Sequence, residues 1–349
     1  MFPNTLRLSV FFSTLLVYSA AAQEPSQPHQ PGRFRTQSNA VLIPTLVRDK
    51  GGALVHGLKA EDFIVEDNGV EQRVHLDGED EPAPVSLVIA IQLGRTAASE
   101  LPRIETLGTM LDPVLGSGRN RAAIVTFDSE VELIRSFTSN GRLIAADLKN
   151  LRPGDGKAAV VDAVGFSVAL LKREPRERRR VLLLVSETRD HGSHVVSFED
   201  TVQAISESNT LVYALAFSPS VSKVLDTIRG QHDDKDVPSQ RGALQLMPLV
   251  VMAVQAMRKN APKTIASMSG GEYELFTSQS GFESRMTAFA NHLHNRYLLS
   301  FEPKEPQLGL HKVSVRLRQP QNATVLARDR YWATAAESDH EGRVDKRQP

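Results

Sequence analysis

The sequence predicts an α/β fold with a three-layer, mostly parallel sheet of the Rossmann-like kind, together with a small flanking β-sandwich. Unbroken apolar runs at residues 85–91 (VSLVIAI), 181–185 (VLLLV) and 211–217 are typical of strands that helices bury on both faces. Segments with helical periodicity alternate with these runs, as they do in parallel sheets. Short strand-like segments occur before and after this region. Since each set is too small to be stable alone, we expect the two sets to form one sandwich.

We place the central domain at residues 84–295. The first helix is predicted from one apolar stripe that contains Ile104, Leu107, Leu111 and Val114, and another from the stripe of Val160, Val164, Val168 and Leu171. The other predicted strands are 122–127, 131–134 and 272–276, and the other predicted helices are 143–151, 201–207, 261–268 and 282–293.

The flanking segments are expected at residues 39–80 and 296–334. The first contains the strand patterns 41–43, 45–47 and 63–65, with turns at 49–52 and 67–69. The second contains the patterns 297–301 and 313–317 and ends on Tyr331 and Trp332, which we expect to pack the last strand onto the sandwich. Residues 335–349 are predicted to be a polar tail.

The first 22 residues are typical of a secretory signal peptide. Arg7 precedes an apolar run at residues 8–18, and three alanines at 20–22 offer a cleavage pattern. Residues 23–38, rich in Pro and Gln, are expected to be a linker. Neither the leader nor the apolar segment 243–257 reaches the roughly 20 residues of a membrane span, and the latter favours a buried or interface helix. We therefore predict an exported protein, periplasmic or extracellular, without a transmembrane anchor after cleavage.

Composition and motifs argue against several functions. The 349 residues include 41 basic and 41 acidic side chains, and this balance indicates no general affinity for nucleic acid. The sequence contains no cysteine, which excludes disulfides and thiolate metal sites. The basic run at 172–180 lacks interleaved aromatic residues, so we expect a solvated helix end and loop. His191 and His194 could bind a metal by residue type, whereas His292 and His294 are expected at the surface. No nucleophile elbow or phosphate-binding loop is present, so no enzymatic activity is predicted.

Several segments together resemble a known family. They are residues 46–49 (LVRD), 57–63 (GLKAEDF), 125–128 (VTFD), 186–190 (SETRD), 269–271 (SGG), 297–299 (YLL) and 330–332 (RYW). Their order over residues 39–332 resembles the von Willebrand factor type A fold and, more narrowly, the exported acidobacterial von Willebrand type A-related proteins. The resemblance implies a protein-binding role outside the inner membrane.

Many domains of this fold bind a divalent cation at a metal-ion-dependent adhesion site, whose first loop has the pattern Asp-x-Ser-x-Ser. The resemblance places Gln92 at the Asp position, and Gly94 and Thr96 at the two Ser positions. The second-loop Thr falls on Ala158 or, with a shift of one residue, on Lys157, and the third-loop Asp falls on Glu187. Asp155 and Asp190 could supply replacement carboxylates.

The altered site predicts metal-independent recognition. Mg²⁺ prefers about six oxygen ligands, and of the matched positions only Thr96 and Glu187 keep clear ligand chemistry. We therefore expect no cofactor beyond weak Mg²⁺ binding, and an unidentified protein partner in the cleft formed by residues 92–96, 154–158 and 187–190. Two alternatives remain: a scaffold protein of the cell envelope with a vestigial cleft, and a secreted hydrolase.

Overall fold

The computed structural model describes residues 40–76, 83–94, 97–98, 100–116, 118–217, 246–304, 307–319 and 322–334, with the backbone alone at 246–248. The predicted signal peptide (1–22), linker (23–38) and polar tail (335–349) lie outside these residues, and so does Thr96.

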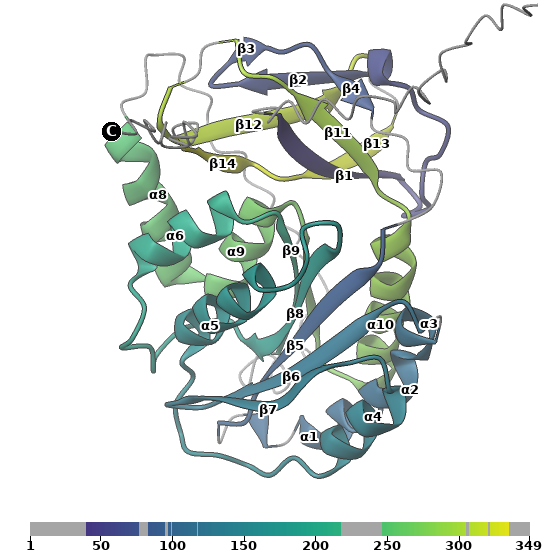
Figure 1. Ribbon diagram of the computed structural model, residues 1–349, viewed down its shortest axis with the longest axis vertical. Coiled ribbons are helices and arrows are strands. Elements are labelled where there is room, and N and C mark those ends of the chain that lie inside the picture. The colour runs from purple at the N-terminus through teal and green to yellow at the C-terminus, as the bar shows by residue number, and fades with distance from the viewer. Residues whose placement is uncertain are drawn as a thin grey trace, which may run out of the picture. The chain divides into compact units, whose positions relative to one another are not determined.

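A six-stranded sheet forms the centre of the fold, with the strand order β10-β9-β8-β5-β6-β7 (Figure 1). All neighbours pair in parallel except β7, which runs antiparallel to β6 at the edge. Every residue of β5 and β9 is buried, as their apolar sequences predict. The strands are β5 (Val85–Gln92), β6 (Arg121–Phe127), β7 (Val131–Thr138), β8 (Arg179–Glu187), β9 (Thr210–Phe217) and β10 (Glu272–Phe276).

Helices cover both faces of this sheet, so the predicted three-layer arrangement is confirmed. Side chains that alternate along β5 enter two separate cores: Ile89 packs with one set of helices and Val88 with the other. The first set is α1 (Leu101–Ile104), α2 (Leu107–Met110), α3 (Asp112–Leu115), α4 (Gly141–Lys149) and α10 (Gln279–His294). The second set is α5 (Val160–Lys172), α6 (Phe198–Glu207), α8 (Leu246–Lys259) and α9 (Ala261–Ser269). Among the described helices, none is both long enough and apolar enough to cross a bilayer.

The segment predicted as one helix around Ile104 and Val114 is three short helices instead. The apolar stripe is buried as expected, but α2 ends at Met110 and α3 begins at Asp112 with Pro113 in its first turn. Proline has no backbone N–H to donate to the preceding turn and clashes with its carbonyl, so a continuous helix is interrupted there.

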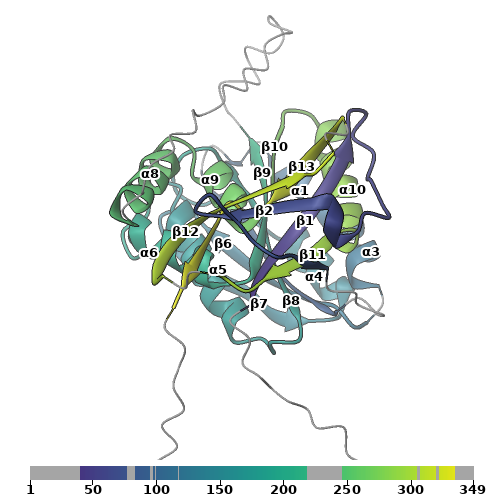
Figure 2. The same ribbon diagram turned by 90° about the horizontal axis from the view of Figure 1, so that it is seen from above.

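The terminal strands form the predicted sandwich of two four-stranded sheets, β13-β1-β11-β4 and β14-β12-β2-β3 (Figure 1). Figure 2 shows β1, β2, β11, β12 and β13 of this sandwich from above. Each sheet combines strands from before and after the central domain. Tyr331 is buried against Phe301 in the shared core, as predicted for the last strand. Trp332 packs instead against the core that contains α5, α6, α8 and α9, so the prediction for this residue is wrong. The bounds are β1 (Val41–Asp49), β2 (Phe63–Asp67), β3 (Val70–Glu71), β4 (His75–Leu76), β11 (Tyr297–Phe301), β12 (Gly309–Leu317), β13 (Ala323–Ala327) and β14 (Arg330–Ala333), with the 3-10 turn η1 (Ala60–Asp62) before β2.

Strand β1 is continuous through Pro44, where the sequence suggests two separate strand segments. Its first half, up to Thr45, pairs with β11, and its second half, from Thr45 onward, pairs with β13. At Pro44, β1 therefore has a neighbouring strand on one side only. No second strand needs the backbone N–H that proline lacks.

Buried polar contacts join the sandwich to the central domain. Arg328, which follows β13, is 4% exposed and donates to the carbonyl oxygens of Ser206 on α6 and Leu42 on β1. Arg48 on β1 lies 3.7 Å from the Glu272 carboxylate on β10. These contacts fix the two parts against each other across their junction.

The surface position predicted for His292 is wrong, whereas His294 is exposed as predicted. His292 is 6% exposed, and its Nδ1 lies 2.8 Å from Oε2 of Glu272, whose other oxygen accepts from Arg296 at 2.9 Å. Burial alone would raise the pKa of Glu272, but these two partners hold that pKa below its ordinary value. A buried carboxylate on a neighbouring strand thus explains a polar residue on the inner face of α10.

Candidate binding cleft

Three loops meet at the carboxyl ends of β5 and β8, where ligand sites of open parallel sheets lie. Gly154 N–H donates to the carbonyl of Leu93 at 2.7 Å, which joins the loop before α5 to the loop after β5. His191 N–H donates to the carbonyl of Ala158 at 3.1 Å, which joins the loop before α5 to the loop after β8. The structure therefore brings together the three segments that the sequence assigns to the cleft.

Gln92 and Glu187 form a reciprocal pair at the base of this cleft. Gln92 is fully buried, and its Oε1 accepts from the backbone N–H of Glu187 at 2.8 Å. This bond fixes the amide orientation, so Nε2 points to the Glu187 carboxylate and donates to Oε1 at 2.9 Å. His191 Nε2 lies 2.6 Å from the same oxygen, with its side chain 42% exposed. The carboxylate thus has one buried amide partner and one partner at the surface.

Gly94 has no side-chain oxygen and no room for one. A Cβ at this position would lie 2.3 Å from the carbonyl oxygen of Lys157, a distance that real contacts do not show. Ala158 is fully buried and contributes only backbone atoms, while Lys157 is exposed. The close approach of the first two loops therefore requires glycine at position 94.

Asp155 and Asp128 shape the second loop. The Asp155 carboxylate accepts from the backbone N–H of Lys157 at 2.8 Å, and its own N–H donates to Asp128 Oδ2 at 3.0 Å. A hydrogen bond from Ser129, followed by the one from Lys157, lowers the pKa of Asp155. Asp155 therefore orders its own loop and ties it to the turn between β6 and β7.

Asp190 is bound to the beginning of α5. Its Oδ1 accepts from the backbone N–H of Val161 at 3.1 Å and from the hydroxyl of Ser193 at 2.5 Å. Ser193 Oγ in turn accepts from the N–H of Asp162 at 3.0 Å. A carboxylate here is favourable because the first N–H groups of a helix lack partners within the helix. Asp190 is thus a capping residue for α5.

Asp162 is a residue that the sequence analysis does not identify. Its side chain is only 4% exposed and accepts from three consecutive N–H groups of the loop after β8: His194 at 2.9 Å, Val195 at 3.1 Å and Val196 at 2.7 Å. An acidic residue in a helical first turn is a weak sequence signal, because most such residues face solvent. Only the fold places a loop of donors opposite it.

Three of the matched positions around the cleft offer no available side-chain oxygen to a divalent cation. Gln92 Oε1 is engaged by a backbone N–H, and Gly94 and Ala158 offer no side-chain oxygen. Within the part of the chain that the structure describes, no group of three or more His, Asp or Glu side chains is placed to hold a metal, and this includes the surroundings of His191 and His194. A magnesium site needs about six hard oxygen ligands.

A family comparison agrees with the fold of the central domain. Residues 103–241 match the model of the von Willebrand factor type A domain. The central domain has the von Willebrand factor type A fold. No curated protein matches the sequence.

Solved structures with similarity to this chain include three bacterial proteins. The conserved hypothetical protein BatB of Bacteroides thetaiotaomicron is 13% identical, with a TM-score of 0.40 over 60% of this chain and 100% of its own. An aerotolerance-related membrane protein of Bacteroides fragilis is 15% identical, with a TM-score of 0.38 over 59% and 98%. The PilB minor pilin of Streptococcus sanguinis is 10% identical, with a TM-score of 0.43 over 62% and 63%. At such low identity the likeness does not extend to binding or activity.

Proposed function

We propose that this protein is exported and binds a protein partner through the cleft of its von Willebrand factor type A domain, without a bridging metal ion. The hydrogen-bonded unit of Gln92, Glu187 and His191 supports this proposal most directly. In this unit, an amide and an imidazole share one oxygen, Oε1, of the carboxylate that a cation would otherwise bind. Export follows from the leader-like sequence and from the resemblance to the exported acidobacterial family.

Exposed groups around the cleft suit contact with a protein surface. Val195, in the loop held by Asp162, is 77% exposed. Arg189 is exposed on the same loop, and Lys157 is exposed on the loop before α5. An exposed apolar side chain offers desolvation energy and exposed cationic side chains offer charge complementarity, which protein interfaces combine. These atoms are available for recognition without rearrangement of the buried network.

Calorimetric titration with Mg²⁺ and Mn²⁺ tests the metal-independent part of the proposal. We expect no binding in the micromolar range, because the described carboxylates are already paired. Micromolar binding that disappears in the Glu187→Ala variant would contradict the proposal. Glu199→Ala, at an exposed position in the first turn of α6, serves as the matched control.

Site-specific photo-crosslinking in the native cell tests the location of the contact. We expect a cross-linker at position 195 to capture one protein, with the same yield in the presence of EDTA, and a cross-linker at exposed Leu143 on α4 to capture none. Val195→Asp introduces a charge at the contact and should remove the adduct formed from position 157. Equal capture from positions 195 and 143, or a loss of capture with EDTA, would contradict the proposal.

The scaffold alternative is distinguished by the same assay. If the cleft is vestigial, substitutions of Thr96 and Glu187 leave partner capture unchanged, whereas the proposal expects the Glu187 substitution to weaken it. A hydrolase would show turnover in a substrate screen that one side-chain change abolishes.

A further inference from the structure

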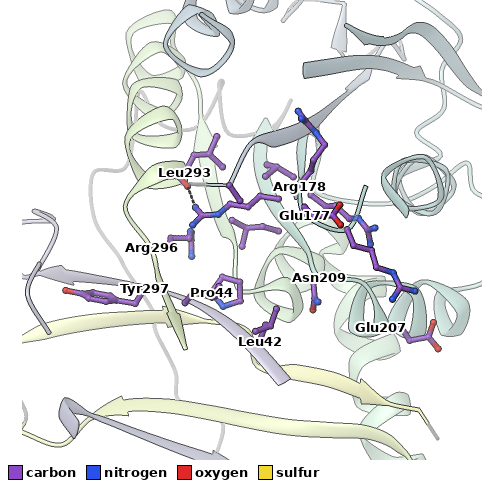
Figure 3. Close-up of a pocket in the computed structure, with 16 residues that line it drawn as sticks. Leu42, Pro44, Glu177, Arg178, Glu207, Asn209, Leu293, Arg296 and Tyr297 are labelled. Atoms are coloured by element: carbon purple, nitrogen blue, oxygen red, sulfur yellow. Dashed lines mark hydrogen bonds between the residues drawn. The ribbon is translucent and has the colours of Figure 1, made fainter. Parts of the chain in front are cut away.

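A second pocket lies at the other end of the central sheet, independent of the proposed function. It has a volume of about 460 Å³ and is lined by residues at the amino ends of β8 and β9, by the end of α10 and by β1 and β11 of the sandwich (Figure 3). Ligand pockets of proteins range from roughly 300 to 1,000 Å³. This pocket is therefore large enough for a small molecule.

One part of the pocket wall is apolar. Pro44 and Leu42 on β1 face Leu293 at the end of α10 across the pocket (Figure 3). Leu298 on β11 and Leu211 on β9 also line the pocket. Contact with them favours a hydrocarbon group, because transfer of apolar surface from water is favourable.

The other part of the wall is cationic, with five arginines against two glutamates. Two of these arginines are structural. Arg178 donates to the carbonyl oxygens of Val85 and Arg119 at 2.6 and 2.9 Å, and Arg296 donates to Tyr213, Gly270 and Glu272. The basic run at residues 172–180 is thus only in part the solvated segment that its sequence predicts. Within it, the Arg178 side chain is 14% exposed.

A third arginine, Arg179, donates to the carbonyl oxygen of Leu293 at 3.4 Å. The remaining two arginines of the wall are Arg180 and Arg176. Arg180 donates to the carbonyl oxygen of Glu174 at 3.0 Å, but its buried Nε has no hydrogen-bond partner among the described atoms. Burial and then the neighbouring charge of Arg176 lower the pKa of Arg180. The Arg176 side chain is exposed. An anion between these two guanidinium groups would offset their mutual repulsion.

The two glutamates balance only part of the charge of the five arginines. Glu207 lies 3.5 Å from Lys172, which does not line the pocket, and also accepts from Gln203. Glu177 is exposed. The pocket therefore keeps an excess of positive charge beside an apolar surface.

We propose that this pocket binds an amphipathic anion, whose carboxylate or phosphate head pairs with Arg176 and Arg180 and whose alkyl group lies against Leu42, Pro44 and Leu298. Guanidinium groups bind both heads through paired, charge-assisted hydrogen bonds. The apolar wall distinguishes such a ligand from an inorganic anion, and the arginines distinguish it from a neutral hydrocarbon.

Isothermal titration of the full chain with four probes tests the chemistry of the ligand. Octanoate and octyl phosphate carry both features, octanamide lacks the charge, and inorganic phosphate lacks the alkyl group. We expect one site per chain for at least one of the first two probes, and an affinity at least tenfold lower for octanamide and for phosphate. The head with the higher affinity identifies the ligand class. Equal binding of octanamide would overturn the proposal, and so would equal binding of phosphate or no binding of either amphipathic probe.

Matched variants test the location. Arg176→Gln and Arg180→Gln should each weaken the tighter amphipathic probe about tenfold or more, whereas Arg173→Gln, an exposed arginine of the same run that does not line the pocket, should leave it unchanged. Leu298→Glu should abolish binding from the opposite wall. Circular dichroism melting curves establish that each variant is folded, and Arg176→Gln decides the test if Arg180→Gln does not fold. Unchanged affinity in folded Arg176→Gln and Leu298→Glu would overturn the proposal.

Discussion

Asp162 holds the loop that carries Val195, and its replacement tests whether the cleft is preorganised by this one buried carboxylate. The carboxylate accepts three backbone N–H groups, from His194, Val195 and Val196. Hydrogen bonds to charged groups contribute a net free energy of about 1.5–3 kcal/mol each. Because the loop is partly exposed, water can replace some of these hydrogen bonds in the variant. We therefore expect Asp162→Ala to lower the free energy of unfolding by about 4 kcal/mol.

Asp162→Asn separates the charge and acceptor effects. One amide oxygen can still accept from Val195 and Val196, which share Oδ1, but the amide NH₂ would then face the N–H of His194, which donates to Oδ2 in the native protein. A donor opposite a donor leaves one N–H unpaired, so the loss should be about 2 kcal/mol.

Urea denaturation followed by circular dichroism measures both losses, and hydrogen exchange at residues 194–196 shows whether the loop itself is released. Glu199→Ala is the control, since surface substitutions usually stay within about 0.5 kcal/mol of the wild type. A similarly small change for Asp162→Ala, with unchanged exchange at 194–196, would refute the role of this carboxylate.

Three further changes test other parts of the structure. Gly94→Ala places a methyl group 2.3 Å from the Lys157 carbonyl oxygen, and a loss of about 2 kcal/mol in urea unfolding is expected for such overpacking. Burial disfavours the charge of His311, but its hydrogen bond to Asp67 raises the His311 pKa. The contribution of this pair to the free energy of unfolding should therefore be complete below about pH 6.5 and should fall as the pH rises through the higher folded pKa. This pH dependence should be absent in His311→Phe. Arg328→Met leaves buried carbonyl oxygens without a donor and should cost about 3 kcal/mol in thermal unfolding.

The central sheet could be predicted because its signal is local. Residues 181–185 form a continuous apolar run, and such a run is stable as a strand only when both faces are covered. Whether a helix is continuous could not be predicted from apolar spacing in this way. Pro113 interrupts a segment whose apolar residues are otherwise spaced as in one helix. Periodicity identifies the buried face, while the breaks depend on backbone donors that periodicity does not register.

The cleft could be predicted only as a set of positions. Alignment of the loops identifies Gln92 and Glu187, but their reciprocal hydrogen bonds depend on the separation of β5 and β8. Asp162 accepts from His194, about 30 residues further along the chain. His191 contacts Glu187, which lies at the end of the strand that precedes its loop. Residue type alone does not reveal such contacts. His292 shows the same limit, because the carboxylate that justifies its burial belongs to another element.

The amino-end pocket depends on the sandwich as well as on the central domain. Leu42 contributes its side chain to the apolar wall and its carbonyl oxygen to Arg328, so the same residue builds the pocket and joins the two parts. A von Willebrand factor type A domain without β1 and β11 would keep the arginines but lose the surface of Leu42, Pro44 and Leu298. Any ligand that needs both charge and an apolar surface would then bind only the assembled chain. The terminal strands thus add a wall, and with it a selectivity, that the central fold does not supply by itself.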